Sequence, residues 1–156
     1  MTNTAALQQL YQQLILDHAR ERHGYGLRGE AGAAGAGESF QVNPTCGDEV
    51  RLRVSTAGGQ ISDVSWEGVG CSISQASTSV LTDLVSGASL TRVGELAESF
   101  SALMHSRGAG VDADTEEALG DAAAFAGVSK YPARVKCAML GWMALRDALI
   151  KASEGE

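Results

Sequence analysis

The sequence predicts a single domain, residues 1–156, in which a small antiparallel sheet of three strands packs with several helices. A chain of 156 residues is long enough for one hydrophobic core and too short for two comfortable ones. Three short segments between residues 40 and 66 alternate apolar and polar side chains, which is the pattern of half-buried strands. Longer segments before and after them space their apolar residues three or four apart, as amphipathic helices do.

A helix is expected near the N-terminus. The side chains of its apolar stripe are Leu7, Leu10, Tyr11, Leu14 and Ile15. Asp17 and His18 follow on the polar side, and we interpret them as a solvated helix face rather than as an acid–base pair. Residues 24–37 are rich in Gly and Ala without periodicity, which predicts a flexible loop. Neither GxGxxG nor GxxxxGK[ST] occurs there, so a phosphate-binding loop is not indicated.

The three strands are predicted to follow in order. Their apolar positions are Phe40 and Val42, then Val50, Leu52 and Val54, then Ile61, Val64 and Trp66. Residues 57–60 supply a hairpin turn between the second strand and the third. Arg51 and Arg53 alternate with the apolar residues of the second strand, and we interpret them as solvated outer-face residues. The pattern indicates an antiparallel sheet with one buried face.

Four helical segments are predicted after the sheet. The first follows Cys71 and ends at Ser86-Gly87, the second spans residues 92–105, a short third spans 118–125, and the last begins at Pro132. Residues 106–117 contain two glycines, four acidic residues and no aromatic, so we expect a surface excursion there. His105 precedes it at the polar end of a helix and is interpreted as a surface residue.

The segment Asn43-Pro44-Thr45-Cys46-Gly47-Asp48 places a thiol and a carboxylate two residues apart on a tight turn. The chain has two other cysteines, Cys71 and Cys137. Three thiols and one carboxylate are four potential ligands, the number that a tetrahedral zinc ion takes. An odd number of cysteines fits poorly with a closed disulfide framework. Metal binding or thiol chemistry is therefore the better explanation for these residues.

The other two cysteines lie in different settings. Cys71 stands at a helix start, where unpaired backbone N–H groups and the helix dipole favour a thiolate. A small buried cysteine filling a strand–helix corner is the alternative, and for Cys71 alone it is the favoured one. Cys137 lies in the second turn of the last helix, and Arg134 shares its helical face three residues earlier. A cation there would stabilise an anionic sulfur, although an exposed arginine without a role is the alternative.

Charge and hydropathy exclude several classes of protein. The net charge of −7 argues against nucleic-acid binding, which normally needs a basic face. No apolar run reaches the length of a membrane span, and the N-terminus lacks a basic region followed by an apolar signal segment. We therefore expect a cytoplasmic protein whose thiols stay reduced.

Four motifs together resemble the SufU branch of the NifU/IscU-type iron–sulfur assembly proteins. They are Leu10-Tyr11 through Asp17-His18, Asn43 through Asp48, Gly70-Cys71-Ser72-Ile73-Ser74, and Pro132-Ala133-Arg134-Val135-Lys136-Cys137-Ala138. Related cluster scaffolds place a His immediately before the third cysteine, where this chain has Lys136. The interval between Cys71 and Cys137 is also longer than in those scaffolds. The family's Pro-Arg-Asn-x-Gly after the first helix is replaced here by Glu21-Arg22-His23-Gly24-Tyr25-Gly26, so partner contacts of that segment are not carried over.

The resemblance implies an α+β domain that receives sulfur from a pyridoxal-phosphate (PLP) cysteine desulfurase of the SufS type and serves downstream iron–sulfur scaffold proteins. It implies Cys46, Asp48, Cys71 and Cys137 as Zn2+ ligands, with Cys46 as the sulfur acceptor. The residues support this choice of acceptor, because Cys46 is predicted on a turn and can swing, whereas Cys71 and Cys137 are held by helices.

If three thiolates bind zinc, no free nucleophile remains, so we hypothesise that the partner supplies a replacement ligand, a neutral imidazole, and frees Cys46. Two alternatives stay open. The same four residues would hold a nascent iron–sulfur cluster in a scaffold, or a purely structural zinc in an adaptor.

Overall fold

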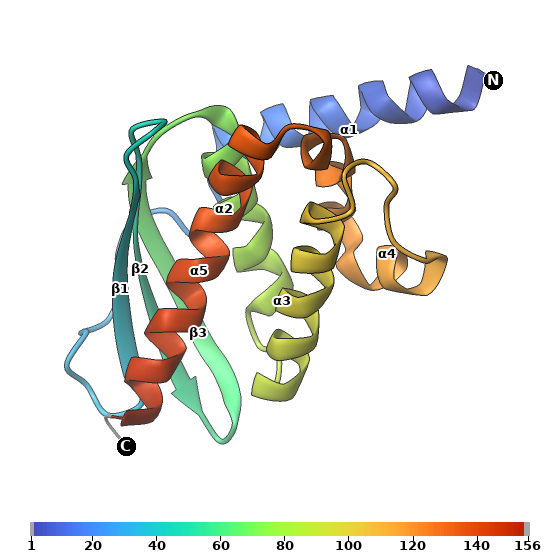
Figure 1. The fold of residues 1–156 in the computed structure, drawn as a ribbon. Helices are drawn as coiled ribbons and strands as arrows, with labels where there is room; N and C mark the ends of the chain where they lie inside the picture. Colours follow the sequence, from blue (N-terminus) through green and yellow to red (C-terminus); the bar gives the residue numbers. More distant parts are fainter. Residues whose placement is uncertain (1, 155–156) are drawn as a thin grey trace.

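Helices and strands account for most of residues 2–154, the part that the computed structural model describes, with side chains from residue 5 onward (Figure 1). The elements in order are α1 (Thr2–Glu21), β1 (Ala36–Asn43), β2 (Asp48–Ala57), β3 (Gln60–Val69), α2 (Ser72–Val85), α3 (Leu90–Met104), α4 (Ala113–Leu119), the 3-10 helix η1 (Gly120–Lys130) and α5 (Pro132–Glu154). The predicted α+β architecture in one domain is confirmed, and residues 1, 155 and 156 of the predicted domain lie outside the described part. Within that part, no helix combines the length and the apolar character that crossing a membrane requires.

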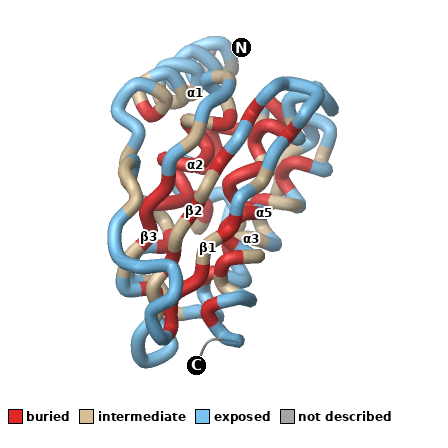
Figure 2. Tube along the Cα trace, turned by 90° about the vertical axis from the view of Figure 1, so that its left-hand side faces the viewer, coloured by how far each residue is buried: buried red, intermediate tan, exposed pale blue. Residues whose placement is uncertain are grey.

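The sheet is an antiparallel meander in the order β1-β2-β3. Its register pairs Asn43 with Asp48 across the first turn, and Leu52 with Trp66 in the middle of the sheet. Buried and more exposed positions alternate along the central strand β2, whose outer side faces the viewer in Figure 2. Because side chains of a strand point alternately to its two faces, this pattern confirms one buried face. In β1 the predicted apolar positions Phe40 and Val42 are exposed, so that part of the prediction is wrong, because the small or polar residues Ala36, Gly37, Ser39 and Asn43 occupy the buried positions instead.

Helices α5 and α2 cover that buried face (Figure 1). Helix α5 lies along β1 and β2, and α2 packs beside α5. Gly37 of β1 touches the backbone of α5, since a Cβ there would overlap the carbonyl oxygen of Ala148 and lie 2.7 Å from the nitrogen of Ala152. At the other end of β1, Asn43 lies against Cys137 of α5. The helix and the strand therefore run together from one end of β1 to the other.

An aromatic cluster joins α3 and η1 to this layer. The ring of Phe100 on α3 stacks on Trp142 of α5 at 5.0 Å and meets Phe125 of η1 edge-on at 5.9 Å. All three residues are buried. Such contacts between large aromatic side chains bury much apolar area, so this cluster fixes α3 and η1 against α5.

The predicted loops 24–37 and 106–117 are both shorter than expected, and the helix predicted over 118–125 is the end of α4 followed by η1. Strand β1 begins at Ala36, before the alternating residues, and so takes the last two residues of the predicted loop 24–37. The start of that loop is also hydrogen-bonded to β3: Trp66 donates its backbone N–H to Gly24 and accepts one from Gly26. Helix α4 begins at Ala113, inside the predicted surface excursion 106–117. The reason is that Asp112 caps it by accepting from the backbone N–H of Thr115.

Two interpretations of single side chains are wrong. His18 is buried rather than solvated, with its Nδ1 2.8 Å from Ser79 Oγ on α2. Arg53 is largely buried and, together with Arg51, binds Glu38 across the β1–β2 pair. The periodicity could show which face these residues occupy, but not that another element or a cross-strand carboxylate covers that face.

Candidate metal centre

Three segments far apart in the sequence bring sulfur and carboxylate atoms together beside the β1–β2 turn. The Sγ atoms of Cys137 and Cys46 are 3.4 Å apart. One ligand atom each of Cys46, Asp48 and Cys137 lies within 4.8 Å of the other two. Cys71 joins them through Asp48, whose Oδ2 is 4.0 Å from the Cys71 Sγ. The four residues predicted as ligands therefore lie in one cluster.

The turn between β1 and β2 presents Cys46. The carbonyl of Asn43 accepts hydrogen bonds from the backbone N–H groups of Cys46, at 3.3 Å, and Gly47, at 2.9 Å. Gly47 has a φ of 72°, a left-handed conformation that glycine adopts without strain. Cys46 is exposed at this turn, whereas Asp48, two residues later, is fully buried.

Asp48 is held by the start of α2. Its Oδ1 accepts a hydrogen bond from the backbone N–H of Cys71 at 2.9 Å, and its Oδ2 lies on the side of the Cys71 sulfur. Gly70 makes this approach possible, since a Cβ at that position would overlap Asp48 Oδ1 and lie 2.8 Å from Ser74 Oγ. Cys71 is the N-cap residue of α2 and makes no side-chain capping bond, as expected for a cysteine at a helix start whose sulfur is turned elsewhere.

Cys137 is the deepest of the three thiols, with no exposed surface. Burial raises the pKa of the Cys137 thiol, and hydrogen bonds with Asp48, Cys46 and Cys71 raise this pKa further. The amide Nδ2 of Asn43 lies 3.8 Å from its sulfur. Burying several negative groups together is costly without a cation. Three sulfurs and one carboxylate oxygen are donors that zinc accepts in a tetrahedral site, so the donor set fits this ion.

The thiols differ in their access to solvent. Cys46 is exposed, Cys71 is intermediate and Cys137 is buried. Arg134 is exposed on α5 and, among the side chains that the structure describes, none forms a hydrogen bond or ion pair with its guanidinium. Its part in the chemistry stays a prediction.

Sequence reasoning missed the roles of Asn43 and Gly70. Both lie inside the motifs that carry the cysteines, immediately before the turn and before Cys71. The register of the hairpin could have indicated Asn43, since it faces Asp48 at the end of the first strand. The role of Gly70 depends on the approach of Asp48 from another strand, so no local signal pointed to it.

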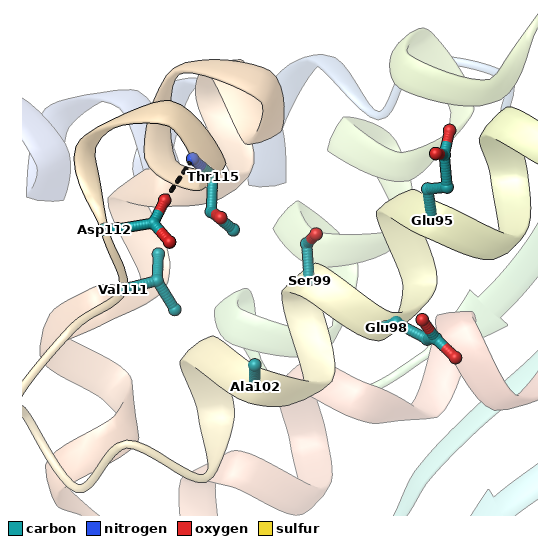
Figure 3. Close-up of a pocket in the computed structure, with 7 residues that line it drawn as sticks. All are labelled: Glu95, Glu98, Ser99, Ala102, Val111, Asp112 and Thr115. Atoms are coloured by element: carbon teal, nitrogen blue, oxygen red, sulfur yellow. Dashed lines mark hydrogen bonds between the residues drawn. The ribbon is translucent and has the colours of Figure 1, made fainter.

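A pocket of about 530 Å³ lies apart from the cysteines, between α3 and the segment leading into α4 (Figure 3). It is lined by Glu95, Glu98, Ser99, Ala102, Val111, Asp112 and Thr115. Asp112 already serves as the helix cap, and the lining contains no thiol or imidazole. The cysteine cluster is therefore the stronger candidate for the chemistry of this protein.

Comparison with known proteins agrees with the geometry. The model of the NifU-like N-terminal domain family matches residues 10–151. The chain is 37% identical over 155 residues to the zinc-dependent sulfurtransferase SufU of Bacillus subtilis (strain 168), covering 99% of each protein. It is 35% identical over 151 residues to the iron–sulfur cluster assembly scaffold protein IscU of Streptococcus pyogenes serotype M1, covering 96% of this chain and 89% of that protein.

A solved structure is similar to this chain in both fold and sequence. It is a candidate iron–sulfur cluster assembly scaffold protein for the SUF system from Fervidobacterium islandicum AW-1. The TM-score is 0.72 at 34% identity, with 87% of this chain and 93% of that chain covered. The resemblance expected from the cysteine motifs is thereby confirmed, and this chain belongs to the NifU-like N-terminal domain family as a SufU-type member.

Proposed function

We propose that this protein is a zinc-dependent sulfurtransferase of iron–sulfur cluster assembly. In this proposal Cys46, Asp48, Cys71 and Cys137 hold Zn2+, and Cys46 accepts persulfide sulfur from a PLP-dependent cysteine desulfurase of the SufS type in the cytoplasm. The observation that carries the proposal is the convergence of these four donors with Cys46 as the exposed thiol among the three. The name of the Bacillus subtilis relative supports the same activity.

The transfer needs a thiolate that can reach a partner. Bound zinc would keep the cysteine sulfurs deprotonated at neutral pH. An imidazole from the partner would take the place of Cys46 at the zinc. The freed thiolate of Cys46 attacks the outer sulfur of the partner's cysteine persulfide and forms a new S–S bond. The partner's own S–S bond breaks at the same time, and its cysteine leaves as a thiolate. Cys46 then carries the persulfide, and the exchange needs no external oxidant or reductant.

The exposure of Cys46 supports this assignment of roles. A docking protein can reach the turn at residues 44–47, whereas it cannot reach the buried sulfur of Cys137 without opening the fold. Cys71 is bound through its backbone to Asp48 and begins a helix, so it is less free to move. We expect Cys71 and Cys137 to hold the centre while Cys46 reacts.

A second function is favoured by the names of other relatives. Proteins 35% and 34% identical to this chain are named iron–sulfur cluster assembly scaffold proteins. In that function the same four residues would hold a nascent cluster. Lys136 stands where related scaffolds have a His, which favours the sulfurtransferase. Purified protein with stoichiometric iron and sulfide that passes a cluster to an apo-acceptor would favour the scaffold instead.

Peptide-resolved mass spectrometry after one turnover tests the proposal. With the desulfurase and L-cysteine present, we expect the Cys46 peptide of the wild-type protein to gain one sulfur. Cys46→Ser should gain none and should not stimulate the desulfurase, because a hydroxyl near neutral pH is a far poorer nucleophile than a thiolate. Sulfur found first on Cys71 or Cys137, in protein that still holds its metal, would refute the assignment.

A further inference from the structure

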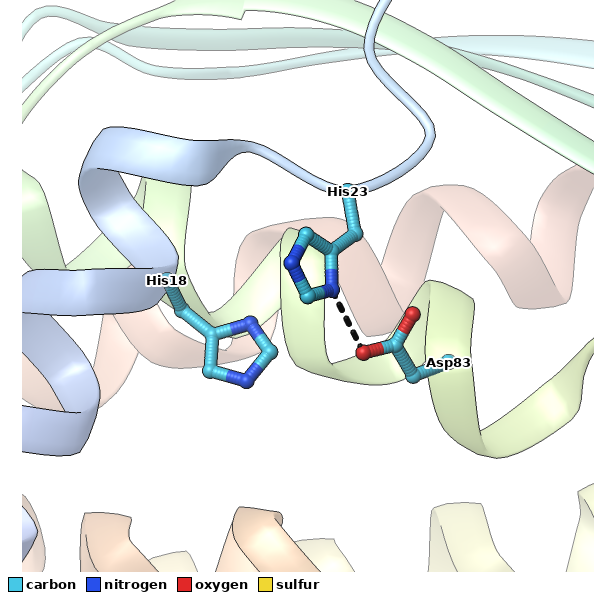
Figure 4. Close-up of side chains that lie close together, drawn as sticks. All are labelled: His18, His23 and Asp83. Atoms are coloured by element: carbon cyan, nitrogen blue, oxygen red, sulfur yellow. Dashed lines mark hydrogen bonds and ion pairs between the residues drawn. The ribbon is translucent and has the colours of Figure 1, made fainter.

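Two of the three histidines of the chain meet an aspartate at the C-terminal end of α1 (Figure 4). His18 lies on α1, His23 follows that helix, and Asp83 projects from α2. One ring nitrogen of each histidine and one carboxylate oxygen of Asp83 lie within 4.8 Å of one another. Asp83 is twelve residues beyond Cys71, about 18 Å along the helix, so the two clusters are separate.

We propose that His18, His23 and Asp83 form a second binding site, for a divalent transition-metal ion, with zinc as the expected ion. Imidazole nitrogens and carboxylate oxygens are ligands that zinc binds well, and three protein ligands leave one position for water. The site is independent of the cysteine centre and of the proposed sulfur transfer.

One proposed ligand, His18, is already held in place by a hydrogen bond to α2. The Nδ1 of buried His18 is 2.8 Å from Ser79 Oγ, and the same oxygen accepts the backbone N–H of His23 at 2.8 Å. Metal-binding imidazoles commonly use their other nitrogen in such a hydrogen bond, which fixes the ring. Arg22 has a φ of 47°, and this left-handed residue turns the chain so that the His23 ring lies 4.7 Å from the His18 ring.

The carboxylates around the two histidine rings favour a positively charged group at this site. Three carboxylates face the rings: Asp83 is 2.6 Å and Glu21 2.8 Å from the two nitrogens of His23, and Asp121 is 3.3 Å from Nε2 of His18. Ionised carboxylates only accept hydrogen bonds, so all three present oxygen atoms with negative charge to the imidazole rings. A metal ion bound by the rings would lie among these charges.

A cation can reach the site from solvent. The side chains of His23 and Asp83 are 36% and 51% exposed, whereas that of His18 is 8% exposed. Ligand atoms around a tetrahedral zinc ion are about 3.4 Å apart, given bonds of about 2.1 Å. Rotation of the His23 and Asp83 side chains can bring their ligand atoms to this spacing from the nitrogen of the fixed His18 ring.

Zinc titration of the purified full chain tests the site. The protein is first brought to one zinc ion per chain, which fills the cysteine centre, so that only an ion taken up beyond it is counted. We expect one additional zinc ion per chain, with changes in the NMR ring signals of His18 and His23 and none in those of His105. His105 is a natural reference, since it lies exposed at the end of α3 and bonds locally to the carbonyl of Ser101.

Three variants make the test specific. His23→Gln and Asp83→Asn should weaken binding of the additional ion at least about tenfold. His105→Gln, the matched control, should bind it as the wild type does. Unchanged metal content before the titration shows that each variant is folded around its cysteines. The proposal is overturned if the wild type takes up no additional ion, if His23→Gln still binds it with unchanged affinity, or if the signals of His105 move instead.

Discussion

At the scale of single residues, the cysteine centre separates groups that are held from the group that can react. Asp48 is buried and bonded to the backbone of α2, and Cys137 is buried beside Asn43. Cys46 is exposed on the turn between β1 and β2. In the proposed transfer, the side chain that meets the partner is therefore attached to a centre whose other members do not need to move.

Arg134→Ala tests whether a cation near this centre assists the transfer. We expect unchanged zinc content and melting temperature, because the guanidinium makes no ion pair or hydrogen bond in the described part of the chain. Turnover with the desulfurase should fall roughly three- to tenfold if the guanidinium reaches the anionic sulfur during transfer, since such a charge contributes about 1 kcal/mol. Arg146→Ala, an exposed arginine on the same helix, is the control and should leave turnover unchanged. Equal turnover of both variants and the wild type would show that Arg134 has no part in the reaction.

The sequence could single out the three cysteines and Asp48 as candidates because their settings are local, and the family resemblance joined them into one proposed ligand set. A Cys-x-Asp turn, a cysteine at a helix start and a cysteine one turn into a helix are all readable from their neighbours. The burial of His18 could not be read in this way. Its partner Ser79 is 61 residues away, and a His on the polar side of one helix is solvated unless another helix packs over it.

At the scale of elements, the β1–β2 pair is linked by charge as well as by its backbone. Glu38 of β1 accepts hydrogen bonds from both Arg51 and Arg53 of β2, at 3.1 and 2.6 Å to their nearest nitrogens. Burial alone would raise the pKa of Glu38, but the hydrogen bonds from Arg53 and Arg51 lower it below its usual value. The carboxylate therefore stays ionised in the folded protein at pH values where it is protonated in the unfolded chain.

Glu38→Gln should destabilise the fold in a pH-dependent way. Because the pKa of Glu38 is lower in the folded protein, its ionised form stabilises the fold at pH values above about 4.3, the pKa of a glutamate in the unfolded chain. This stabilisation is lost as the pH falls through the pKa of Glu38 in the folded protein. We expect the variant to lose about 1 kcal/mol of unfolding free energy at pH 7, as partly exposed ion pairs contribute. Urea unfolding at pH 7 and pH 3 should show the difference shrinking at the lower pH. Glu98→Gln, an exposed glutamate on α3, should change little, and a loss for Glu38→Gln that persists undiminished at pH 3 would contradict the explanation.

Element boundaries were less predictable than element types. The start of β1 was missed because Gly37 packs on α5 without a side chain and so adds nothing to an apolar pattern. The start of α4 was placed too late because its acidic residues were interpreted only as a sign of exposure. At a helix N-terminus such residues are also stabilising, and Asp112 provides the cap.

At the scale of the whole molecule, the cysteine centre connects the sheet to two helices. Its residues come from the β1–β2 turn and the start of β2, the N-terminus of α2 and the second turn of α5. A metal bound there would cross-link three elements that otherwise meet through the apolar core. The fold class was predictable because each element shows its own periodicity, but the order in which helices cover the sheet depends on contacts between distant segments.

Removal of the metal should lower the thermal stability of the protein. An ion that binds only the folded state stabilises it by about 4 kcal/mol when its free concentration is a thousand times its dissociation constant. We expect a chelator to lower the melting temperature and added zinc, but not magnesium, to restore it, because thiolates prefer the softer ion. Cys137→Ser, which lacks one of the proposed ligands, should respond much less to the chelator. Identical melting of wild-type protein with and without chelator would argue against a metal at this centre.

The contact between Gly37 and α5 has a consequence for divergence among related proteins. Strand β1 and helix α5 touch through their backbones at this glycine, and they run side by side to the pair Asn43 and Cys137. At the Gly37 end the spacing between the strand and the helix is therefore set by main-chain atoms rather than by the volume of core side chains. Core residues elsewhere can change in size over evolution while β1 and α5 keep their distance at this end.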